Sequence, residues 1–167
     1  FNSDISNWDV SNMTSMEGLF YEALNFNSDI SNWDVSSVTN MSYMFDHAIF
    51  NADISSWNVS SVTNMEYMFK NASFNSDISN WDVSNVTSME GLFYEALNFN
   101  SDISNWDVSN VTNMSDMFKN TTDFNSDISN WDLSNVTTME EMFREAESFN
   151  SDISNWDVSS VTTMSQM

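Results

Sequence analysis

One unit of 24–25 residues repeats along the whole chain, and this period limits the fold more than any other feature. Successive tryptophans are separated by 25, 24, 24, 25, 25 and 25 residues. The unit reads F-N-x-D-I-S-x-W-D-V-S-x-V-T-x-M-x-x-M-F-x-x-A-x-x, and no linker or change of composition interrupts it. Periods of this length are typical of proteins in which each unit packs only on its neighbours. We therefore expect residues 1–167 to form one array.

Seven copies of the unit make up this array. The first and fourth copies differ only at Met13 and Val86, which indicates duplication of a three-copy block. The seventh copy stops before a full unit is complete, and neither terminal copy carries the polar cap that such arrays need for solubility. We expect the chain to be a segment of a longer array. The copies span residues 1–25, 26–49, 50–73, 74–98, 99–123, 124–148 and 149–167.

The first half of the unit has the spacing of a strand. Ile5, Trp8 and Val10 match the pattern L-x-x-L-x-L of a leucine-rich repeat, a repeat class of 20–29 residues. Trp8 and Val10 would share one face of the strand, with Asn7 and Ser11 among the residues on the other. In phase with Val10, the tryptophans are expected in the core, and a sugar-stacking strip is the weaker alternative.

The second half has the period of an amphipathic helix, with apolar residues at i, i+3, i+4 and i+7. Thr14 precedes this stripe as a candidate N-cap, and Glu17 completes a capping box. We predict a leucine-rich-repeat-like solenoid with one short parallel β-strand and one short helix in each turn of 24–25 residues. The stripe of the first copy is Met16, Leu19, Phe20 and Ala23.

Charge excludes two classes of partner. The chain has 25 acidic and 3 basic residues, a formal net charge of −22. Nucleic acids and anionic membranes both attract basic surfaces, so we expect neither as a partner. No apolar run approaches the roughly 18 residues of a membrane span, so we expect no membrane insertion in this segment.

The chain offers few side chains that could take part in catalysis. Without cysteine there is no thiol nucleophile, disulfide or zinc-thiolate site. His47 is the only histidine and occurs in one copy of seven. Stacked identical carboxylates lack the contrasting environments that separate the pKa values of an acid and a base. We expect a protein that is not an enzyme, in which Lys70, Lys119 and Arg144 offset nearby acids on the exposed helix face.

Two ranks of aspartates are the only candidates for a cofactor site, with calcium as the ion. Stacked carboxylates repel one another, and calcium accepts six to eight oxygens in irregular geometry. Two alternatives stay open: the rank that begins at Asp4 caps turn amides, and the second rank is a solvated face. The calcium candidates in the second rank are Asp9, Asp34, Asp82, Asp107, Asp132 and Asp157.

Two asparagine patterns accompany the repeat. The rank that begins at Asn2 and Asn27 is expected to satisfy backbone groups of a bend. Nine further asparagines stand in N-x-S/T sequons, which carry glycans in a secreted eukaryotic protein and need carry no meaning in a bacterial one. The glycosylation candidates are Asn12, Asn40, Asn58, Asn71, Asn85, Asn110, Asn113, Asn120 and Asn135.

The motif W-D-V-S-x-V-T-x-M-x-x-M-F, seen for example at 33–45 and 106–118, carries a family resemblance. It resembles the BspA-like leucine-rich-repeat surface proteins, in the methionine-rich branch first described as mycoplasma proteins of unknown function. The resemblance implies an extracellular or cell-surface location and roles in adhesion or scaffolding. It brings no catalytic residues.

These patterns together favour a non-catalytic extracellular structural or adhesive protein, a cell-surface scaffold or filament component with an acidic and N-glycosylated surface. Its expected partners are further copies of the same repeat, because open apolar ends could stack one subunit on another. One alternative is an adhesin module that recognises a host protein or glycan through the strand face with Asn7, Asp9 and Ser11. A calcium-stiffened extracellular rod is the other.

Overall fold

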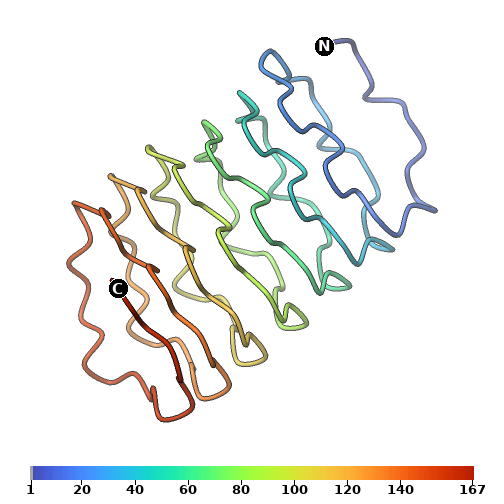
Figure 1. Ribbon diagram of the computed structural model, residues 1–167. Helices are drawn as coiled ribbons and strands as arrows, with labels where there is room; N and C mark the ends of the chain where they lie inside the picture. Colours follow the sequence, from blue (N-terminus) through green and yellow to red (C-terminus); the bar gives the residue numbers. More distant parts are fainter. Residues whose placement is uncertain (1) are drawn as a thin grey trace.

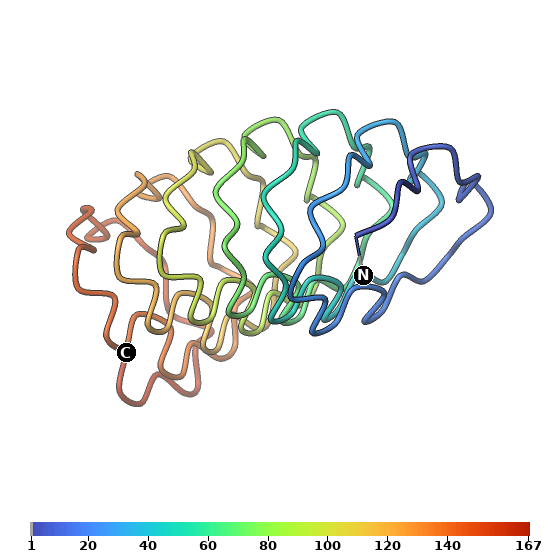
Figure 2. The ribbon, with the colours of Figure 1, turned by 90° about the horizontal axis from the view of Figure 1, so that it is seen from above.

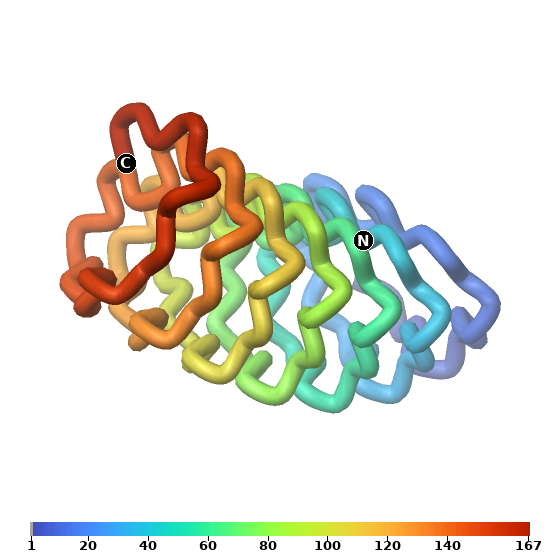
Figure 3. Tube along the Cα trace, turned by 90° about the horizontal axis from the view of Figure 1, so that it is seen from below, coloured from blue at the N-terminus to red at the C-terminus, as the bar shows by residue number. Residues whose placement is uncertain are grey.

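Each repeat makes one coil of the chain, and the coils follow one another in sequence order (Figure 1). The structure, a computed structural model, describes residues 2–167, so Phe1, the first residue of the first repeat, lies outside the described residues. The two ends of the chain lie at opposite ends of the stack (Figure 1). The views from above and below show each coil offset from the one before, so that the stack twists (Figures 2 and 3).

The predicted strand-plus-helix, leucine-rich-repeat architecture is wrong. Residues 2–167 contain no helix and no extended strand. Strand-like pairing between coils is limited, in residues 2–167, to single-residue parallel bridges, which fall beside the repeated threonine and outside the expected strand at residues 5–10. The bridges join Ser15 to Asn40, Asn40 to Asn64, Asn64 to Ser88, Ser88 to Asn113, Asn113 to Thr138, and Thr138 to Thr163.

The segment predicted as a helix is a succession of tight turns. The amides of Leu19 and Ala23 donate to the carbonyls three residues earlier, at 3.1 and 3.0 Å. The amide of Phe20, between them, donates to the carbonyl of Met44 in the next coil at 2.9 Å. An α-helix would send each amide to the fourth preceding carbonyl of its own segment. Here alternate amides hold neighbouring coils together instead.

Left-handed residues explain why no helix forms. Gly18 and Glu22 have φ values of +61° and +54°, and the equivalent positions of the later repeats are left-handed too. A right-handed helix needs a negative φ at every residue, so a left-handed residue at every fourth position interrupts it. The other left-handed residues are Tyr43, His47, Tyr67, Asn71, Gly91, Glu95, Asp116, Asn120, Glu141, Glu145 and Gln166.

The inward stripe survives this change of conformation. Met16 and Phe20, predicted to line one helix face, are 1% and 4% exposed. Thr14 does not act as a helix cap, because no helix follows it, and its carbonyl accepts the Thr39 hydroxyl of the next coil at 3.1 Å. The threonines therefore form a hydrogen-bonded rank along the stack, and the capping box with Glu17 is wrong.

The core consists of identical residues stacked coil upon coil. The inner tryptophans are 4% exposed, and each indole Nε1 donates to an isoleucine carbonyl of the preceding coil, as Trp81 does to Ile54 at 3.2 Å. Phenylalanines stack in the same way, with the Phe69 and Phe93 rings 5.8 Å apart. The prediction of a tryptophan core is confirmed for Trp33, Trp57, Trp81, Trp106 and Trp131.

The asparagine rank is also confirmed, with one difference. From Asn2 to Asn125, each Oδ1 of the rank accepts a backbone amide, but from the next coil and not from its own bend: the Asn51 amide donates to Asn27 at 2.8 Å and the Asn75 amide to Asn51 at 2.8 Å. The asparagine rank therefore links successive coils to one another.

Substitution by glycine should have opposite effects on stability at a left-handed position and at a right-handed one. Changing Glu145, at φ +59°, to glycine should raise the free energy of unfolding by about 0.5–1 kcal/mol, because glycine adopts this conformation without strain. Glu140 of the same repeat has no positive φ, so changing it to glycine should lower the free energy of unfolding by about 0.5–1 kcal/mol. Urea unfolding of both variants measures the two effects. A loss of stability at both glutamates would contradict the turn structure and favour a helix.

Candidate functional site

Both aspartate ranks cap turns. The Asp4 Oδ1 accepts the Ser6 amide at 3.0 Å, and the Asp9 Oδ1 accepts the Ser11 amide at 3.1 Å and its hydroxyl at 2.6 Å. Asn58, which interrupts the second rank, makes the same pair of bonds to Ser60. The capping role expected of the first rank is therefore confirmed, and the second rank shares it. Each of these turns is an Asx-turn.

Calcium binding at these aspartates stays a prediction. Among the residues that the structure describes, no three histidine, cysteine, aspartate or glutamate side chains come together in a group that could hold a metal ion. The six candidates lie exposed, one in each of six coils. A fall in the midpoint of thermal unfolding on addition of a chelator would support the calcium-stiffened rod.

The turn caps make stability depend on pH. Hydrogen bonds from the serine two residues on lower the pKa of these carboxyl groups below its ordinary value near 3.8, and desolvation raises it by less. A lowered folded-state pKa gives stability above the unfolded-state pKa, and this stability disappears as the pH falls through the folded-state pKa. The groups are Asp4, Asp9, Asp29, Asp34, Asp53, Asp77, Asp82, Asp102, Asp127, Asp132, Asp152 and Asp157.

We expect the midpoint of thermal unfolding to fall as the pH is lowered below about 4, near the ordinary pKa of aspartate. Asp82→Asn provides the matched variant, because Asn58 makes the same two bonds without titrating over this range. The variant should lose less stability than the wild type over the same acid range. A midpoint that rises steadily on acidification would show that repulsion among the acids outweighs the turn caps.

The structure places the sequon asparagines at the surface in two environments. Asn12, Asn58, Asn71, Asn85, Asn110 and Asn135 are exposed, and Asn40, Asn113 and Asn120 are partly buried. In Asn85, Asn110 and Asn135, which share one position of the repeat, Nδ2 donates to a carbonyl of the preceding coil; for Asn85 the acceptor is Ser60, at 2.8 Å. These amides therefore also tie coils together. Glycosylation stays a prediction.

All bases, all tyrosines and the single histidine lie in one segment of the coil. They occupy the two left-handed positions and the residue before the second of them. We call this surface the variable ledge, because it is where the copies differ most. Comparing the copies with one another would have revealed it from the sequence. Its members are Tyr21, Tyr43, His47, Tyr67, Lys70, Tyr94, Lys119 and Arg144.

Contacts on the variable ledge are specific to each repeat. The Tyr67 ring stacks on Tyr43 with centroids 5.2 Å apart, and its hydroxyl donates to Glu90 at 2.6 Å. Burial, followed by this hydrogen bond, raises the pKa of Tyr67. The Lys70 ammonium lies 5.6 Å from the centroids of both the Tyr67 and Tyr94 rings.

The two other bases behave as expected in that they offset acids, although on turns and not on a helix. Lys119 pairs with Asp116 at 3.0 Å and with Glu141 at 2.6 Å. Arg144 pairs with Glu141 at 2.9 Å. The His47 Nδ1 lies within hydrogen-bond distance of the buried Asp46 Oδ1. These contacts fix the ledge side chains to their own coil or to a neighbouring one.

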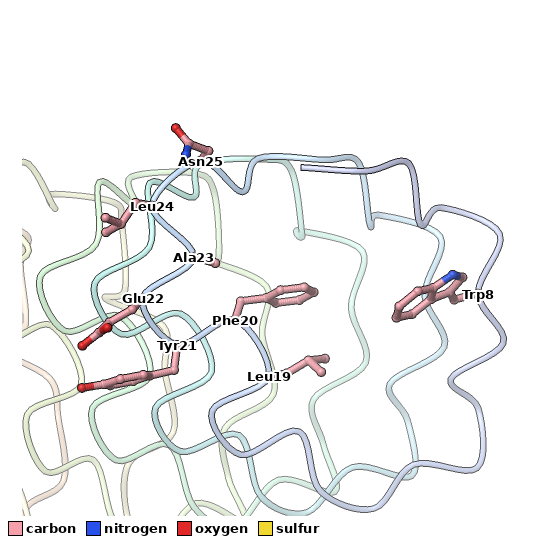
Figure 4. A pocket seen from close by; sticks show the side chains of 8 residues that line it. All are labelled: Trp8, Leu19, Phe20, Tyr21, Glu22, Ala23, Leu24 and Asn25. Atoms are coloured by element: carbon pink, nitrogen blue, oxygen red, sulfur yellow. The ribbon is translucent and has the colours of Figure 1, made fainter. Parts of the chain in front are cut away.

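The first coil leaves an apolar face open at the N-terminal end of the stack. We call this surface the end face. Trp8 is 55% exposed and Leu19 is 37% exposed. Figure 4 shows Leu19 and Phe20 pointing toward Trp8 across the coil, while Tyr21 and Glu22 point away from it. These residues line a hollow of about 590 Å³.

The fourth coil shows the same face covered. Trp81 and Leu92, the equivalents of Trp8 and Leu19 in a nearly identical repeat, are 4% and 0% exposed. The third repeat, residues 50–73, packs on this face of the fourth, and Trp81 donates to its Ile54 carbonyl, whereas no coil lies on this side of the first among the residues that the structure describes. The exposure of the end face is therefore set by a neighbouring coil and not by its own sequence.

The coils have nearly the same sequence and are joined by rows of hydrogen bonds. The chain is therefore a repeat protein, and its structural unit is the single coil. The chain belongs to the family described as "Mycoplasma protein of unknown function, DUF285", whose model matches residues 1–82 and 70–167. No curated protein and no solved structure matches the chain. Within the described residues, no helix is long and apolar enough to cross a membrane.

Proposed function

We propose that the chain is a non-catalytic structural protein of the cell surface, a scaffold or filament component with an acidic, N-glycosylated coat. The observation that carries this proposal is the constancy of the outward groups. Every coil presents the same Asp-x-Ser turn caps, and Asn58 in place of aspartate is the one exception at these positions. A surface that presents the same groups in every coil suits a structural protein better than a protein with one specific binding site.

Bonding between coils supports a mechanical role. Backbone amides, threonine hydroxyls, asparagine amides and indole N–H groups all donate from one coil to a neighbour, as Thr87, Asn75 and Trp81 do to the third repeat. Stability in such an array is close to a sum of units and junctions. Added copies then lengthen the rod without changing its cross-section.

The absence of a catalytic role is part of the same proposal. Acid–base catalysis needs two groups with different pKa values converging on one substrate. The aspartates of the two ranks occupy the same kind of turn, and the same kind of serine contact lowers the pKa of Asp9 and of Asp34. The resemblance to BspA-like surface proteins supports the extracellular location and a role in adhesion.

A second candidate function is favoured by the variable ledge. An adhesin module that recognises a host protein or glycan needs side chains that differ from coil to coil. The face with Asn7, Asp9 and Ser11 repeats the same groups, whereas the ledge concentrates the tyrosines and bases. We therefore assign any such recognition to the ledge around Lys70 and Tyr94.

Labelling of cells that produce the protein tests the proposed function. Antibodies against the 167-residue chain should label intact cells, and electron microscopy should show the label on rods or fibres. Labelling only after permeabilisation would contradict the surface location. Loss of adhesion on replacing Lys70 and Tyr94 with alanine, with rods unchanged, would favour the adhesin module over the scaffold.

A further inference from the structure

The tyrosines of the second and third repeats form a stacked pair on the variable ledge. The Tyr43 and Tyr67 rings lie with their centroids 5.2 Å apart and their planes 15° from parallel. Aromatic rings at this separation and angle are in direct contact. Both side chains are partly exposed, so a reagent in solution reaches the pair and the rings have room to turn.

The fourth coil fixes the position of the Tyr67 ring. A Cβ at Gly91 would lie 2.1 Å from the Tyr67 Cε1, so this edge of the ring rests on the backbone of Gly91. Cε1 is one of the two ring carbons ortho to the hydroxyl. The other ortho carbon, Cε2, is therefore the one on the edge away from Gly91.

A carboxylate is placed to take the phenolic proton of Tyr67. The Tyr67 hydroxyl donates to the Glu90 Oε1 at 2.6 Å, and the Asn113 Nδ2 donates to the Glu90 Oε2 at 2.8 Å, so the fifth coil holds this carboxylate in place. Burial, followed by the Glu90 hydrogen bond, raises the pKa of Tyr67, so the phenol keeps its proton at neutral pH. A phenol that loses an electron must then release this proton, and a hydrogen-bonded carboxylate is the base that accepts it.

The other two tyrosines lack a tyrosine neighbour. Within residues 2–167, Tyr43 and Tyr67 are the only two tyrosines whose rings are in contact. The Lys70 ammonium lies 5.6 Å from the centroids of both Tyr67 and Tyr94, so these two rings contact a cation and not each other. The Tyr21 ring, 51% exposed, lies in the first coil. Chemistry that needs two adjacent phenols is therefore confined to one pair.

We infer that Tyr43 and Tyr67 are a site of oxidative cross-linking, at which a one-electron oxidant joins the two rings by a carbon–carbon bond. The oxidant class is a haem peroxidase supplied with hydrogen peroxide. This inference goes beyond the proposed structural function and does not depend on it, because it concerns a covalent modification between two inner coils.

The atoms and electrons of the reaction balance. Each ring loses one electron to the oxidant and one phenolic proton, which Glu90 accepts from Tyr67 and water accepts from Tyr43. The two phenoxyl radicals pair their electrons in a new bond between carbons ortho to the oxygens. The proton on each joined carbon leaves, and each oxygen takes up a proton again, which restores both hydroxyls. The two electrons and two protons released overall reduce one hydrogen peroxide to two molecules of water.

The cross-link would supply what a disulfide supplies in other proteins. The chain has no cysteine, so no disulfide can join one coil to the next. A bond between residues 43 and 67 closes a loop of one repeat and restricts the unfolded chain. We expect the oxidised chain to unfold at a higher temperature than the untreated one.

Oxidation of the folded chain by a peroxidase and hydrogen peroxide tests the inference. A protease that cleaves after glutamate separates the two tyrosines, because Glu66 lies between them. After oxidation, unfolding and digestion, the peptides 23–66 and 67–90 should remain joined, with the mass of two hydrogen atoms missing. The product should also show the fluorescence of dityrosine and run as a monomer on a denaturing gel.

Phenylalanine variants identify the reacting pair without removing a ring. Tyr43→Phe and Tyr67→Phe should each lose the cross-link completely, and Tyr94→Phe should form it at the wild-type rate. Glu90→Gln keeps an acceptor oxygen but takes up no proton, so it should form the cross-link several-fold more slowly at neutral pH. Thermal unfolding of each variant before oxidation verifies that the fold is kept.

Four results would overturn the inference. They are a cross-link that persists in Tyr43→Phe, joining only between separate copies of the chain, an equal yield of the 43–67 bond in urea, and an unchanged rate in Glu90→Gln. None of these readouts involves the cell surface. Failure of the cross-link therefore leaves the proposed structural function standing, and labelling only of permeabilised cells leaves the cross-link standing.

Discussion

Replacing Trp81 with alanine is expected to lower the free energy of unfolding by about 3–5 kcal/mol, against about 1 kcal/mol for the same change at Trp8. Trp81 is 4% exposed, donates to the Ile54 carbonyl, and lies 6.3 Å from the Phe69 ring. Its removal leaves a cavity between two coils. Urea unfolding followed by circular dichroism measures both losses.

Trp8 is the matched control, because the first and fourth repeats differ only at Met13 and Val86. Trp8 is 55% exposed and contacts the ring of Trp33 at 6.4 Å. The difference between the two variants therefore reports what the covering coil contributes. Equal losses at both tryptophans would mean that the coils do not stack as described.

Gly91→Ala is expected to cost about 2–4 kcal/mol, and Gly18→Ala about 1–2 kcal/mol. Both glycines have a positive φ, +57° and +61°, so the backbone strain of alanine is similar at the two sites. A Cβ at Gly91 would overlap the Tyr67 ring, whereas a Cβ at Gly18 would meet only the Tyr21 Cβ, at 3.8 Å. The extra cost at Gly91 comes from displacing the tyrosine.

A double-mutant cycle separates the two contributions. Displacing the Tyr67 ring would disturb its stacking on Tyr43 and its hydrogen bond to Glu90. In a Tyr67→Ala background, the cost of Gly91→Ala should fall to that of Gly18→Ala, because only the backbone strain remains. Unchanged costs in that background would show that Tyr67 does not cover Gly91.

Stacking of the copies could be predicted from the sequence, and so could the residues that point inward. The period of the tryptophans predicted the coil, and the stripe through Met16 and Phe20 predicted burial. The conformation that buries them could not be read from the same stripe. A helix places residues i, i+3, i+4 and i+7 on one face, and so does this succession of turns with left-handed residues.

Two local signals pointed away from the predicted elements. Asp4 with Ser6 and Asp9 with Ser11 are Asx-turn patterns five residues apart, which leaves no room for a strand through Ile5, Trp8 and Val10. Glycine or asparagine occupies a left-handed position in the first, third, fourth and fifth repeats, as at Gly18, Asn71, Gly91 and Asn120. Tyrosine and glutamate at the equivalent positions of other copies obscured this pattern.

The end face could be predicted only in part. Apolar residues at both ends indicated that the coils continue or stack, but which side chains are open depends on contacts between coils. Leu19 and Leu24 look alike in the sequence, and only the inner copies show that a neighbour covers the first and not the second. The variable ledge was overlooked because its residues differ from the repeated unit by which the array was recognised, although a comparison of the copies with one another would have revealed it.

The backbone conformation of residues 89–96 tests the central claim most directly. Nuclear magnetic resonance should give positive φ angles at Gly91 and Glu95, with the amide of Phe93 bonded to the next coil at Met117. Negative φ angles throughout, with each amide bonded to the fourth preceding carbonyl, would establish a helix and contradict the stack of turns.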